Sequence, residues 1–334
     1  MSKTATAVQP HWEVDEDSPR FHRPGLSSVM GADDNVSLSS AFKSARWKDY
    51  CSPTRLARLL WGVSTNITRQ FEIFHLLALP AFTGLALRDP RFPFKYLADG
   101  YLARGLTVAE RAYCFLHHYR RLHARFPRVL LRRVLRRDLA ILEFLEDGTC
   151  YDITIGLSRR EDIAQDREGE LCLKLRVDGV VVFVLAFSIV PGWVVGSKAA
   201  DVILISRLQG IRGCYPLINQ ATKALREVAP AALLVAVAQG VAEACGIMEM
   251  AGVCATRQVN YTEDLSPFFK KAYDDFFAVL GAARTEANFF LSPIPAEEKS
   301  LATVKNGHKA RTRNKRAFKL QIAENVCRLI RQSC

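Results

Sequence analysis

The sequence predicts an α+β fold: a helical N-terminal part, then a mixed and mostly antiparallel sheet with flanking helices, and a basic C-terminal helix. Three observations predict it. Apolar residues repeat every three or four positions up to residue 137, they alternate with polar residues from residue 138 onwards, and the helical period returns after Val202–Ile205. Strand-rich and helix-rich stretches in separate parts of one chain are typical of α+β proteins.

The chain therefore divides into four segments. Residues 1–45 are polar, Ser-rich and aperiodic, which predicts disorder. We expect a helical basic region over residues 46–137, an α/β core over 138–296 and a basic C-terminal helix over 297–334. With 334 residues, of which 49% are hydrophobic and 24% charged, the chain is long enough to bury most of its apolar surface.

The N-terminal helices follow from periodicity and from helix-end signals. Apolar residues from Leu56 to Val63 repeat on one helix face, and Phe71–Leu79 is expected to be a largely buried helix that ends at Pro80. Thr107 has capping-box spacing to Glu110 and opens a helix that ends near Pro127, followed by a shorter basic helix at Val129–Arg137. The face of the capped helix opposite its apolar side carries three arginines: Arg111, Arg121 and Arg125.

Two hairpins open the expected sheet. Glu146–Thr149 separates the strands Leu139–Leu145 and Tyr151–Leu157, and Asp178-Gly179 separates Glu170–Val177 from Val180–Val190. The later elements are a strand at Val202–Ile205, helices after Pro216 and over Ala231–Cys245 and Lys271–Leu280, strands at Ile247–Val253 and Phe289–Leu291, and a long basic helix from Glu297 that is weakened at Asn306-Gly307.

The cysteines and histidines form no metal-binding pattern. None of the nine cysteines belongs to a C-x-x-C pair, and several stand in apolar runs, where a thiol packs as a small hydrophobe. His117, His118 and His123 do not have the spacing that places two imidazoles on one helix face. We therefore expect no metal site, structural histidines and a reducing compartment.

The apolar stretches of the sequence match neither a secretory signal peptide nor a transmembrane helix. Residues 1–40 contain no apolar stretch of the signal-peptide type. The longest apolar stretches, Val180–Val190 and Ala231–Val241, are far shorter than the roughly 20 residues that span a bilayer. The expectation is a soluble cytoplasmic protein without a transmembrane segment.

The net charge of +12 is concentrated in two segments. Residues 104–137 hold ten arginines against Glu110 alone, and residues 299–334 hold ten lysines and arginines against Glu324 alone. Each segment thus carries +9, and the rest of the chain carries −6. Such localised charge favours an anionic partner, and the alternative is a pair of solvated helix faces.

The C-terminal segment supplies the candidates for binding that partner. Its apolar residues make it a basic amphipathic helix, which fits an anionic membrane surface. Nucleic acid is an alternative, supported by phosphate contacts alone because Phe318 is the single aromatic residue of 299–319. The simplest interpretation of the segment is an exposed helix that packs its apolar side on the core and needs no partner. The candidate residues are Lys305, Lys309, Arg311, Arg313, Lys315 and Arg316.

Several separated motifs resemble the bacterial VirK/YbjX family over roughly residues 55–330. The resemblance implies an intracellular accessory protein linked to virulence, envelope properties and display of surface proteins, with no established chemistry and no catalytic residues to transfer. Phe277 departs from the family pattern, which usually has Trp there. The motifs are Phe92–Leu97, the helix from Glu110 to Tyr119, Leu208-Gln209-Gly210, Ala221–Leu225, Gly246–Val253, Tyr273–Gly281 and the basic tail from Lys305 to Arg316.

A second resemblance concerns the turn after the strand at Val202–Ile205. A strand that ends in a glycine-containing turn and opens a helix resembles the pyrophosphate loop of GNAT-type acyltransferases, in which backbone amides approach a phosphate. This resemblance implies an acyl-CoA-dependent N- or O-acyltransferase, although Arg212 replaces a small residue of that pattern. The alternative is a tight turn that needs glycine for its backbone. The residues implied in acyl-CoA binding are Arg207, Gln209, Gly210, Arg212 and Gly213.

The same resemblance places a tyrosine acid three residues before Leu280-Gly281. This chain has Phe277 there, and a phenyl ring cannot donate a proton to a leaving thiolate. Tyr261 and Tyr273 are therefore the candidate catalytic residues. The leading hypothesis is an accessory protein that acts at the inner face of the cytoplasmic membrane, with an acyltransferase and a non-specific nucleic-acid-binding protein as alternatives.

Overall fold

A computed structural model describes residues 53–159, 167–296, 300, 302 and 304–333, and the segment 1–45, for which disorder is predicted, lies outside these ranges. Helices form the N-terminal part, as the apolar period predicts. They are α2 (Pro53–Thr65), α3 (Ile67–Leu77), α4 (Thr83–Arg88), the 3-10 helix η2 (Phe92–Leu97), α5 (Val108–Arg125) and α6 (Arg128–Arg136).

Helix α5 has the capping box that its sequence predicts. The Thr107 hydroxyl accepts a hydrogen bond from the Glu110 amide at 3.2 Å, and Glu110 Oε2 accepts one from the Thr107 amide at 2.7 Å. One expectation for this helix is wrong. Arg111 is 7% exposed rather than solvated, because its side chain folds under the preceding loop and donates to the Ala98 carbonyl.

Helix α3 is less buried than its apolar sequence suggests. Its buried residues, Gln70, Ile73, Leu76 and Leu77, follow a single helix face. Phe71 and Phe74 lie beside that face and are 60% and 44% exposed. The expectation of a largely buried helix is therefore wrong for its two phenylalanines.

An eight-stranded sheet follows, in the order β1-β2-β3-β4-β5-β6-β8-β7. The first five strands are antiparallel neighbours, β5 and β6 are parallel, and the last pairs are antiparallel again. The α+β class with a mixed, mostly antiparallel sheet is thus confirmed. The strands are β1 (Leu139–Glu146), β2 (Thr149–Leu157), β3 (Leu171–Val177), β4 (Val180–Val190), β5 (Val202–Gly210), β6 (Glu249–Val253), β7 (Ala283–Arg284) and β8 (Phe289–Pro293).

Both predicted hairpin turns have the backbone that a two-residue turn demands. Asp147 and Gly148 have φ of +47° and +75°, and Asp178 and Gly179 have φ of +48° and +80°. Positive φ at both central residues matches the twist of the flanking strands, which explains the Asp-Gly sequence in each turn.

The remaining helices connect and cover the second half of the sheet. The long helix expected from Glu297 begins at Lys309, after a short 3-10 turn at Asn306–His308, and residues 297–299 lie outside the described residues. These helices are α7 (Tyr215–Ala224), α8 (Pro230–Ala244), α9 (Ser266–Phe269), the π-helix η6 (Lys270–Asp275), α10 (Phe276–Val279), α11 (Lys309–Arg331) and the 3-10 helices η3 (Gly192–Val195), η4 (Ala255–Arg257), η5 (Glu263–Leu265) and η8 (Asn306–His308).

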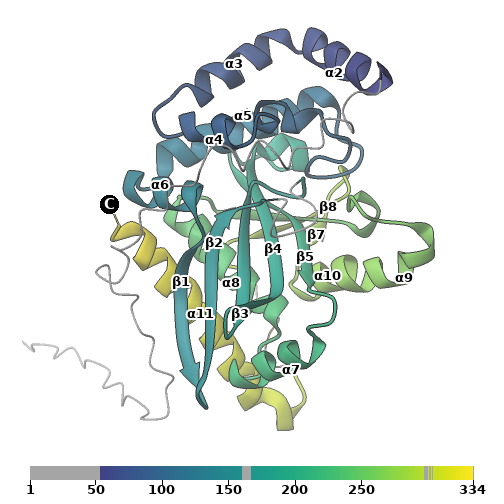
Figure 1. Cartoon of the computed structure of the whole chain (residues 1–334). Helices are drawn as coiled ribbons and strands as arrows, with labels where there is room; N and C mark the ends of the chain where they lie inside the picture. Colours follow the sequence, from purple (N-terminus) through teal and green to yellow (C-terminus); the bar gives the residue numbers. More distant parts are fainter. Residues whose placement is uncertain (1–52, 160–166, 297–299, 301, 303, 334) are drawn as a thin grey trace, which may run out of the picture.

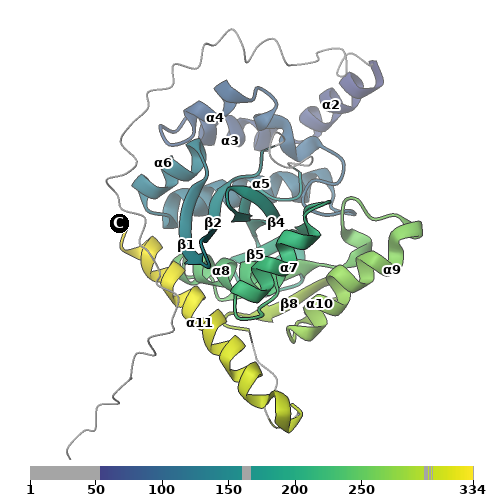
Figure 2. The same ribbon diagram turned by 60° about the horizontal axis from the view of Figure 1, so that its bottom comes forward.

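The helices form a layer on each side of the sheet. In Figure 1 the N-terminal helices lie above the strands, and α7 lies at the opposite end, next to the C-terminal end of β5. Figure 2 shows α2–α6 on one side of the sheet and α8 with α11 on the other. None of the described helices combines the length and apolar character that crossing a membrane requires.

Helices α8 and α11 pack closely along the C-terminal half of α11. A Cβ at Gly240 of α8 would overlap the carbonyl oxygen of Ala323, so glycine permits this approach. Phe318, Ile322 and Val326 of α11 are buried in the same interface. The N-terminal half of α11 extends beyond the sheet in Figure 2.

Candidate functional site

Strands β5 and β6 separate after a short parallel ladder. Their pairing runs from Ile203 opposite Met250 to Ile205 opposite Gly252. β5 then continues to Gly210, five residues beyond its last partner in β6. The gap outside the carboxyl ends of parallel strands is a frequent ligand-binding position in mixed sheets.

A β-bulge marks the point of separation. Ile205 and Arg207 pair with the consecutive β4 residues Phe187 and Ala186, so Ser206 is an extra residue in β5. Bulges bend a strand and increase its twist, and they occur often beside active sites. The bulge therefore accounts for the way in which β5 departs from β6.

Polar side chains, of which all but the half-buried Asn260 are buried, gather where the two strands separate, and we call them the Glu168 cluster. Glu168 precedes β3, and its Oε2 lies 3.0 Å from Arg207 Nη1 of β5. Gln258 and Asn260, which follow β6, both donate to Glu168 Oε1, the latter at 3.0 Å. The Tyr273 hydroxyl, from η6, accepts a hydrogen bond from the Leu208 amide at 3.4 Å. The cluster comprises Glu168, Arg207, Gln258, Asn260 and Tyr273.

Burial changes the acid–base behaviour of this cluster. Glu168 is fully buried, and burial raises the pKa of its carboxyl, against the opposing effects of Arg207 and the Gln258 hydrogen bond. Burial, and then the charge of Glu168, raise the pKa of Tyr273. The phenol thus keeps its proton at neutral pH, and Glu168 is a stronger base than an exposed carboxylate.

Tyr273 and Tyr261, the two candidate acids, have different surroundings. The Tyr261 hydroxyl contacts Glu263 Oε2 at 3.1 Å and Ser266 Oγ at 3.0 Å, near η5 and away from β5. Tyr273 alone of the two contacts the backbone of β5 beyond the bulge. Phe277 is buried against Gly252 and stacks on Phe290, with ring centroids 5.9 Å apart, so it holds η6 and α10 on the sheet.

The residues predicted to bind acyl-CoA do not share one environment. Arg207 is 8% exposed and belongs to the Glu168 cluster. Gln209 is exposed at the end of β5, Arg212 and Gly213 are exposed on the turn between β5 and α7, and Gly210 is half-buried against Phe183 and Ile218. Gly213 has φ of +87° with open space around it, so the turn is accessible and needs glycine there.

A second buried carboxylate lies two residues after Glu168. Glu170 accepts hydrogen bonds from the Tyr101 hydroxyl at 2.7 Å and from the Tyr119 hydroxyl, and Lys95 Nζ lies 3.2 Å away. Burial raises the pKa of both phenols. This network joins η2, the loop after it and α5 to the start of β3, and it places the helical layer against the Glu168 cluster.

The histidines of α5 have structural partners. His118 is fully buried, and its Nδ1 accepts a hydrogen bond from the Ile189 amide of β4 at 3.0 Å. His117 Nε2 lies 2.8 Å from Asp201 Oδ1, and His123 packs its ring against Phe82. Within the described ranges, no three His, Cys, Asp or Glu side chains are grouped as metal ligands would be.

The six basic candidates lie on or just before the projecting half of α11. Arg311 and Lys315 pair with Glu227, which lies between α7 and α8. Lys305 and Arg313 are exposed, and Lys309 and Arg316 are partly buried. These cations therefore belong to the N-terminal half of α11, which extends beyond the sheet in Figure 2, and to the residues just before it, whereas the Glu168 cluster lies between β5, β6 and η6.

Three members of the Glu168 cluster were missed from the sequence: Glu168, Gln258 and Asn260. No local motif marks them, because they come together only through the sheet. The position of Gln258 and Asn260 directly after a strand was a usable signal, since residues that follow parallel strands often line a site. That signal requires knowing that β5 and β6 are parallel neighbours.

The comparisons with known proteins give one result. The model of a family described as "Protein of unknown function (DUF535)" matches residues 56–328. Neither the comparison with curated proteins nor the comparison with solved structures gave a match.

Proposed function

We propose that this chain catalyses an acyl-CoA-dependent acyl transfer. The chain belongs to the DUF535 family. This is the VirK/YbjX family that its motifs resemble. The observation that carries the proposal is the bulge-directed separation of β5 from β6, with Tyr273 bonded to the β5 backbone inside it. The order of the elements supports the proposal: the antiparallel strands up to β5 are followed by a glycine-containing turn, the helices α7 and α8, and the strand β6, which is parallel to β5.

The exposed turn provides the phosphate-binding end of this site. Amides at the start of α7 point toward the space before the helix, where the helix dipole favours an anion. Arg212 and Gly213 lie on that turn, and the rest of the thioester would follow β5 toward Ser206. Beyond Ile205 this edge of β5 has no partner strand among the described residues, so it supplies backbone groups along this path.

The Glu168 cluster supplies the proton transfers. Glu168 accepts the proton of the attacking amine or hydroxyl as the new acyl–nitrogen or acyl–oxygen bond forms. Tyr273 donates its proton to the sulfur as the acyl–sulfur bond breaks, so the products are the acylated acceptor and a free thiol. A proton that returns from Glu168 to Tyr273 restores both groups. Arg207, whose Nη1 lies 3.0 Å from Glu168 Oε2, favours the ionised form of Glu168 between turnovers.

Binding is tested with coenzyme A and no acceptor. A ligand that binds the folded chain alone raises its unfolding temperature, and hydrogen exchange at residues 207–213 should slow. Arg212→Glu should weaken coenzyme A binding about tenfold, since it reverses a charge on the turn. Lys223→Glu makes the same charge change at the far end of α7 and is the matched control. Absence of any thermal shift with acetyl-CoA and a long-chain acyl-CoA at millimolar concentration would exclude the proposal.

Catalysis is tested by thiol release from acetyl-CoA with hydroxylamine as the acceptor. Tyr273→Phe should lower the rate about 10²-fold or more with coenzyme A binding retained, because it removes only the acid. Tyr261→Phe distinguishes the two tyrosines, and we expect it to keep the rate. Equal rates for the wild-type chain and Tyr273→Phe would show that Tyr273 is not the acid.

A second proposed function is docking on an anionic membrane surface through the projecting half of α11. The supporting observation is that the apolar half of α11 is fixed on α8 whereas Lys305, Lys309 and Arg313 lie at its projecting end. Such docking would agree with the envelope setting that the family resemblance implies and with the peripheral cytoplasmic location expected from the basic segments. Each lysine or arginine near such a surface contributes about 1 kcal/mol.

Vesicle sedimentation tests the docking. The chain should bind phosphatidylglycerol vesicles and not phosphatidylcholine vesicles, and replacing Lys305, Lys309 and Arg313 by Gln should weaken binding about 100-fold. The matched control removes three exposed arginines of α6, namely Arg128, Arg132 and Arg136. Equal binding to both lipids would refute the docking, and salt-sensitive binding to duplex DNA that the same triple variant abolishes would favour nucleic acid instead.

A further inference from the structure

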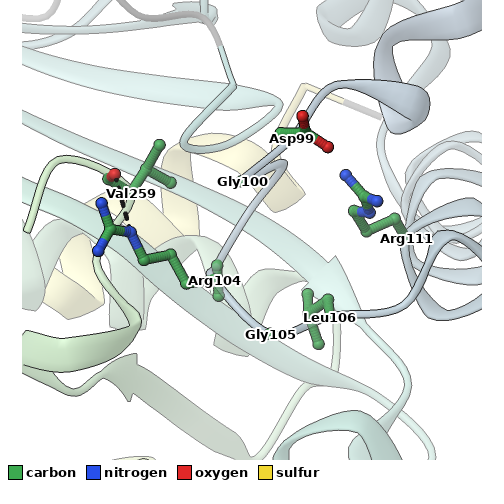
Figure 3. A pocket seen from close by; sticks show the side chains of 8 residues that line it. Asp99, Gly100, Arg104, Gly105, Leu106, Arg111 and Val259 are labelled. Carbon is green, nitrogen blue, oxygen red and sulfur yellow. Dashed lines mark hydrogen bonds between the residues drawn. The ribbon is translucent and has the colours of Figure 1, made fainter. Parts of the chain in front are cut away.

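A polar pocket of about 350 Å³ lies beside the Glu168 cluster, between the loop after η2, the start of α5 and the segment after β6. Figure 3 shows Arg111 and Asp99 on one side of it and Arg104 next to Val259 on the other. Val259 stands between Gln258 and Asn260, which both hydrogen-bond Glu168. The pocket and the proposed proton-transfer site are therefore neighbours.

We infer that this pocket binds the carboxylate of a small-molecule ligand. Arg111 carries the argument: it is 7% exposed and lines the pocket, and its Nη1 donates to the Ala98 carbonyl. Its Nε is buried and has no hydrogen-bond partner among the described residues. A buried donor without a partner is unfavourable, and the Nε edge of a guanidinium matches the two oxygens of a carboxylate.

The loop that forms the pocket includes Ala98, whose carbonyl accepts the Arg111 hydrogen bond, and its conformation is fixed by two glycines and by contacts with Arg257. Gly100 and Gly105 have φ of +76° and +78°, which glycine adopts without strain. The Arg104 amide donates to the Arg257 carbonyl at 2.8 Å, and Arg257 Nη1 returns a hydrogen bond to the Arg104 carbonyl at 3.2 Å. This reciprocal pair fixes the loop against the segment that follows β6.

The charges of the lining favour a monoanion. Arg104 and Arg111 are cationic and Asp99 is anionic, so the lining carries a net charge of +1. Arg104 Nε donates to the Val259 carbonyl at 3.2 Å, which orients its guanidinium beside the pocket. A carboxylate matches this charge, whereas Asp99 would repel the second charge of a phosphate.

The ligand class extends the proposed reaction. A carboxylate held by Arg111 would direct the rest of an acyl acceptor past Val259 toward Glu168, so the acceptor is a small amine or alcohol that also bears a carboxyl group. This acceptor role rests on the acyl-transfer function proposed above. The carboxylate site itself does not, because it stands on the pocket and on Arg111.

The test is a titration of the full chain with acetate, at constant ionic strength and without any acyl donor. Binding is monitored through the arginine Nε–H signals in ¹⁵N NMR. Acetate should shift the Arg111 signal, assigned by its loss in Arg111→Lys, and inorganic phosphate should bind more weakly. Arg111→Lys keeps the charge and loses the fork, and should weaken acetate binding about tenfold. Arg104→Gln should weaken it about threefold, and Arg120→Gln, exposed on the same helix, should leave it unchanged.

Each outcome decides the inference. No acetate-dependent shift of Arg111, or tighter binding of phosphate than of acetate, would overturn the carboxylate site. An equal loss of acetate affinity in Arg120→Gln would also overturn it, because the effect would then reflect overall charge. Acetate binding at Arg111 in a chain that does not bind coenzyme A would leave the carboxylate site standing and remove the acyl-transfer function.

Discussion

Residues 104–137 and 299–334 each carry a net charge of +9, yet their cations have different surroundings. On α5, Arg121 and Arg125 pair with Asp201, which is 7% exposed, and Arg111 is buried under a loop. On α11, Arg311 and Lys315 share the half-exposed Glu227. The α5 arginines join a helix to the start of β5, whereas the α11 cations remain near the surface.

This difference teaches that charge density in a sequence does not identify a binding surface. Arginine suits the α5 position because its planar group bonds carbonyls and carboxylates while its stem packs on apolar neighbours. The charge of α6 behaves otherwise, since Arg128, Arg132 and Arg136 are exposed. Of the two basic segments, the first is therefore partly a structural device, and the second keeps its cations for another partner or for solvent.

The largest expected effect on stability comes from replacing Asp201, the carboxylate with which the α5 arginines pair. Asp201→Asn should lower the free energy of unfolding by about 2 to 3 kcal/mol, because Arg121, Arg125 and His117 lose the negative charge of their shared, buried partner. Urea denaturation followed by circular dichroism measures this change.

Glu227→Gln is the matched experiment on α11. It removes the carboxylate shared by Arg311 and Lys315, and we expect a loss of about 0.5 kcal/mol, because all three side chains are substantially exposed. Equal losses for Asp201→Asn and Glu227→Gln would break the comparison, since both basic helices would then use their cations in the same way.

The stability of the chain should also depend on pH, through the buried histidines of α5. Burial lowers the pKa of His118 to about 3, from 6.5 in an unfolded chain, and burial also lowers the pKa of His117. The unfolded chain therefore binds more protons below pH 6.5, so stability falls as pH decreases. Between pH 7.5 and 5.0, His118 alone should cost about 2 kcal/mol in the free energy of unfolding.

His118→Asn keeps an acceptor for the Ile189 amide and removes the titration. Its stability should change less between pH 7.5 and 5.0 than that of the wild-type chain, whatever its absolute value. His308→Asn, before α11, replaces an exposed histidine and should leave the slope as it is. A wild-type slope that survives in His118→Asn would contradict the assignment.

The elements governed by local chemistry could be predicted from the sequence. Asp178-Gly179 demands a two-residue turn, and Thr107 with Glu110 demands a helix start, whatever the rest of the chain does. The α+β class followed from such local signals. The exposed Phe71 and the buried Arg111 could not be predicted, because their environments depend on which loop or helix covers them.

The candidate site, in contrast, could be predicted from the sequence only in part. Arg207 and Tyr273 were named from the turn and from an aromatic helix, but Glu168 has no local signal. Its partners are 39 to 92 residues away along the chain, and they meet because a bulge at Ser206 opens the sheet. A pattern with a period of two shows where a strand lies and not where an extra residue interrupts its pairing.

The contact between α8 and α11 gives a smaller effect. Gly240→Ala should destabilise the chain by about 1 to 2 kcal/mol, because the added methyl group would meet the Ala323 carbonyl and push α11 outward. Ala238→Gly, also on α8, is the control: it lowers helix propensity by about 1 kcal/mol and removes a buried methyl group, but it adds no atom at the contact with α11. Faster hydrogen exchange across α11 in Gly240→Ala, and not in Ala238→Gly, would localise the damage to the interface.

The smallest expected effect belongs to the cations at the projecting end of α11. Replacing Lys305, Lys309 and Arg313 by Gln should change the free energy of unfolding by no more than about 0.5 kcal/mol, because the apolar half of the helix holds it on α8. The double variant Arg121→Gln with Arg125→Gln should lose more, since it leaves Asp201 buried without its two guanidinium partners. Urea denaturation of both variants at low and high salt makes the comparison sharp: the α5 variant should stay the less stable one at high salt, because its lost contacts are partly buried. A larger loss in the α11 variant would mean that these cations hold the fold together, and it would remove the reason to expect a partner at that end of the molecule.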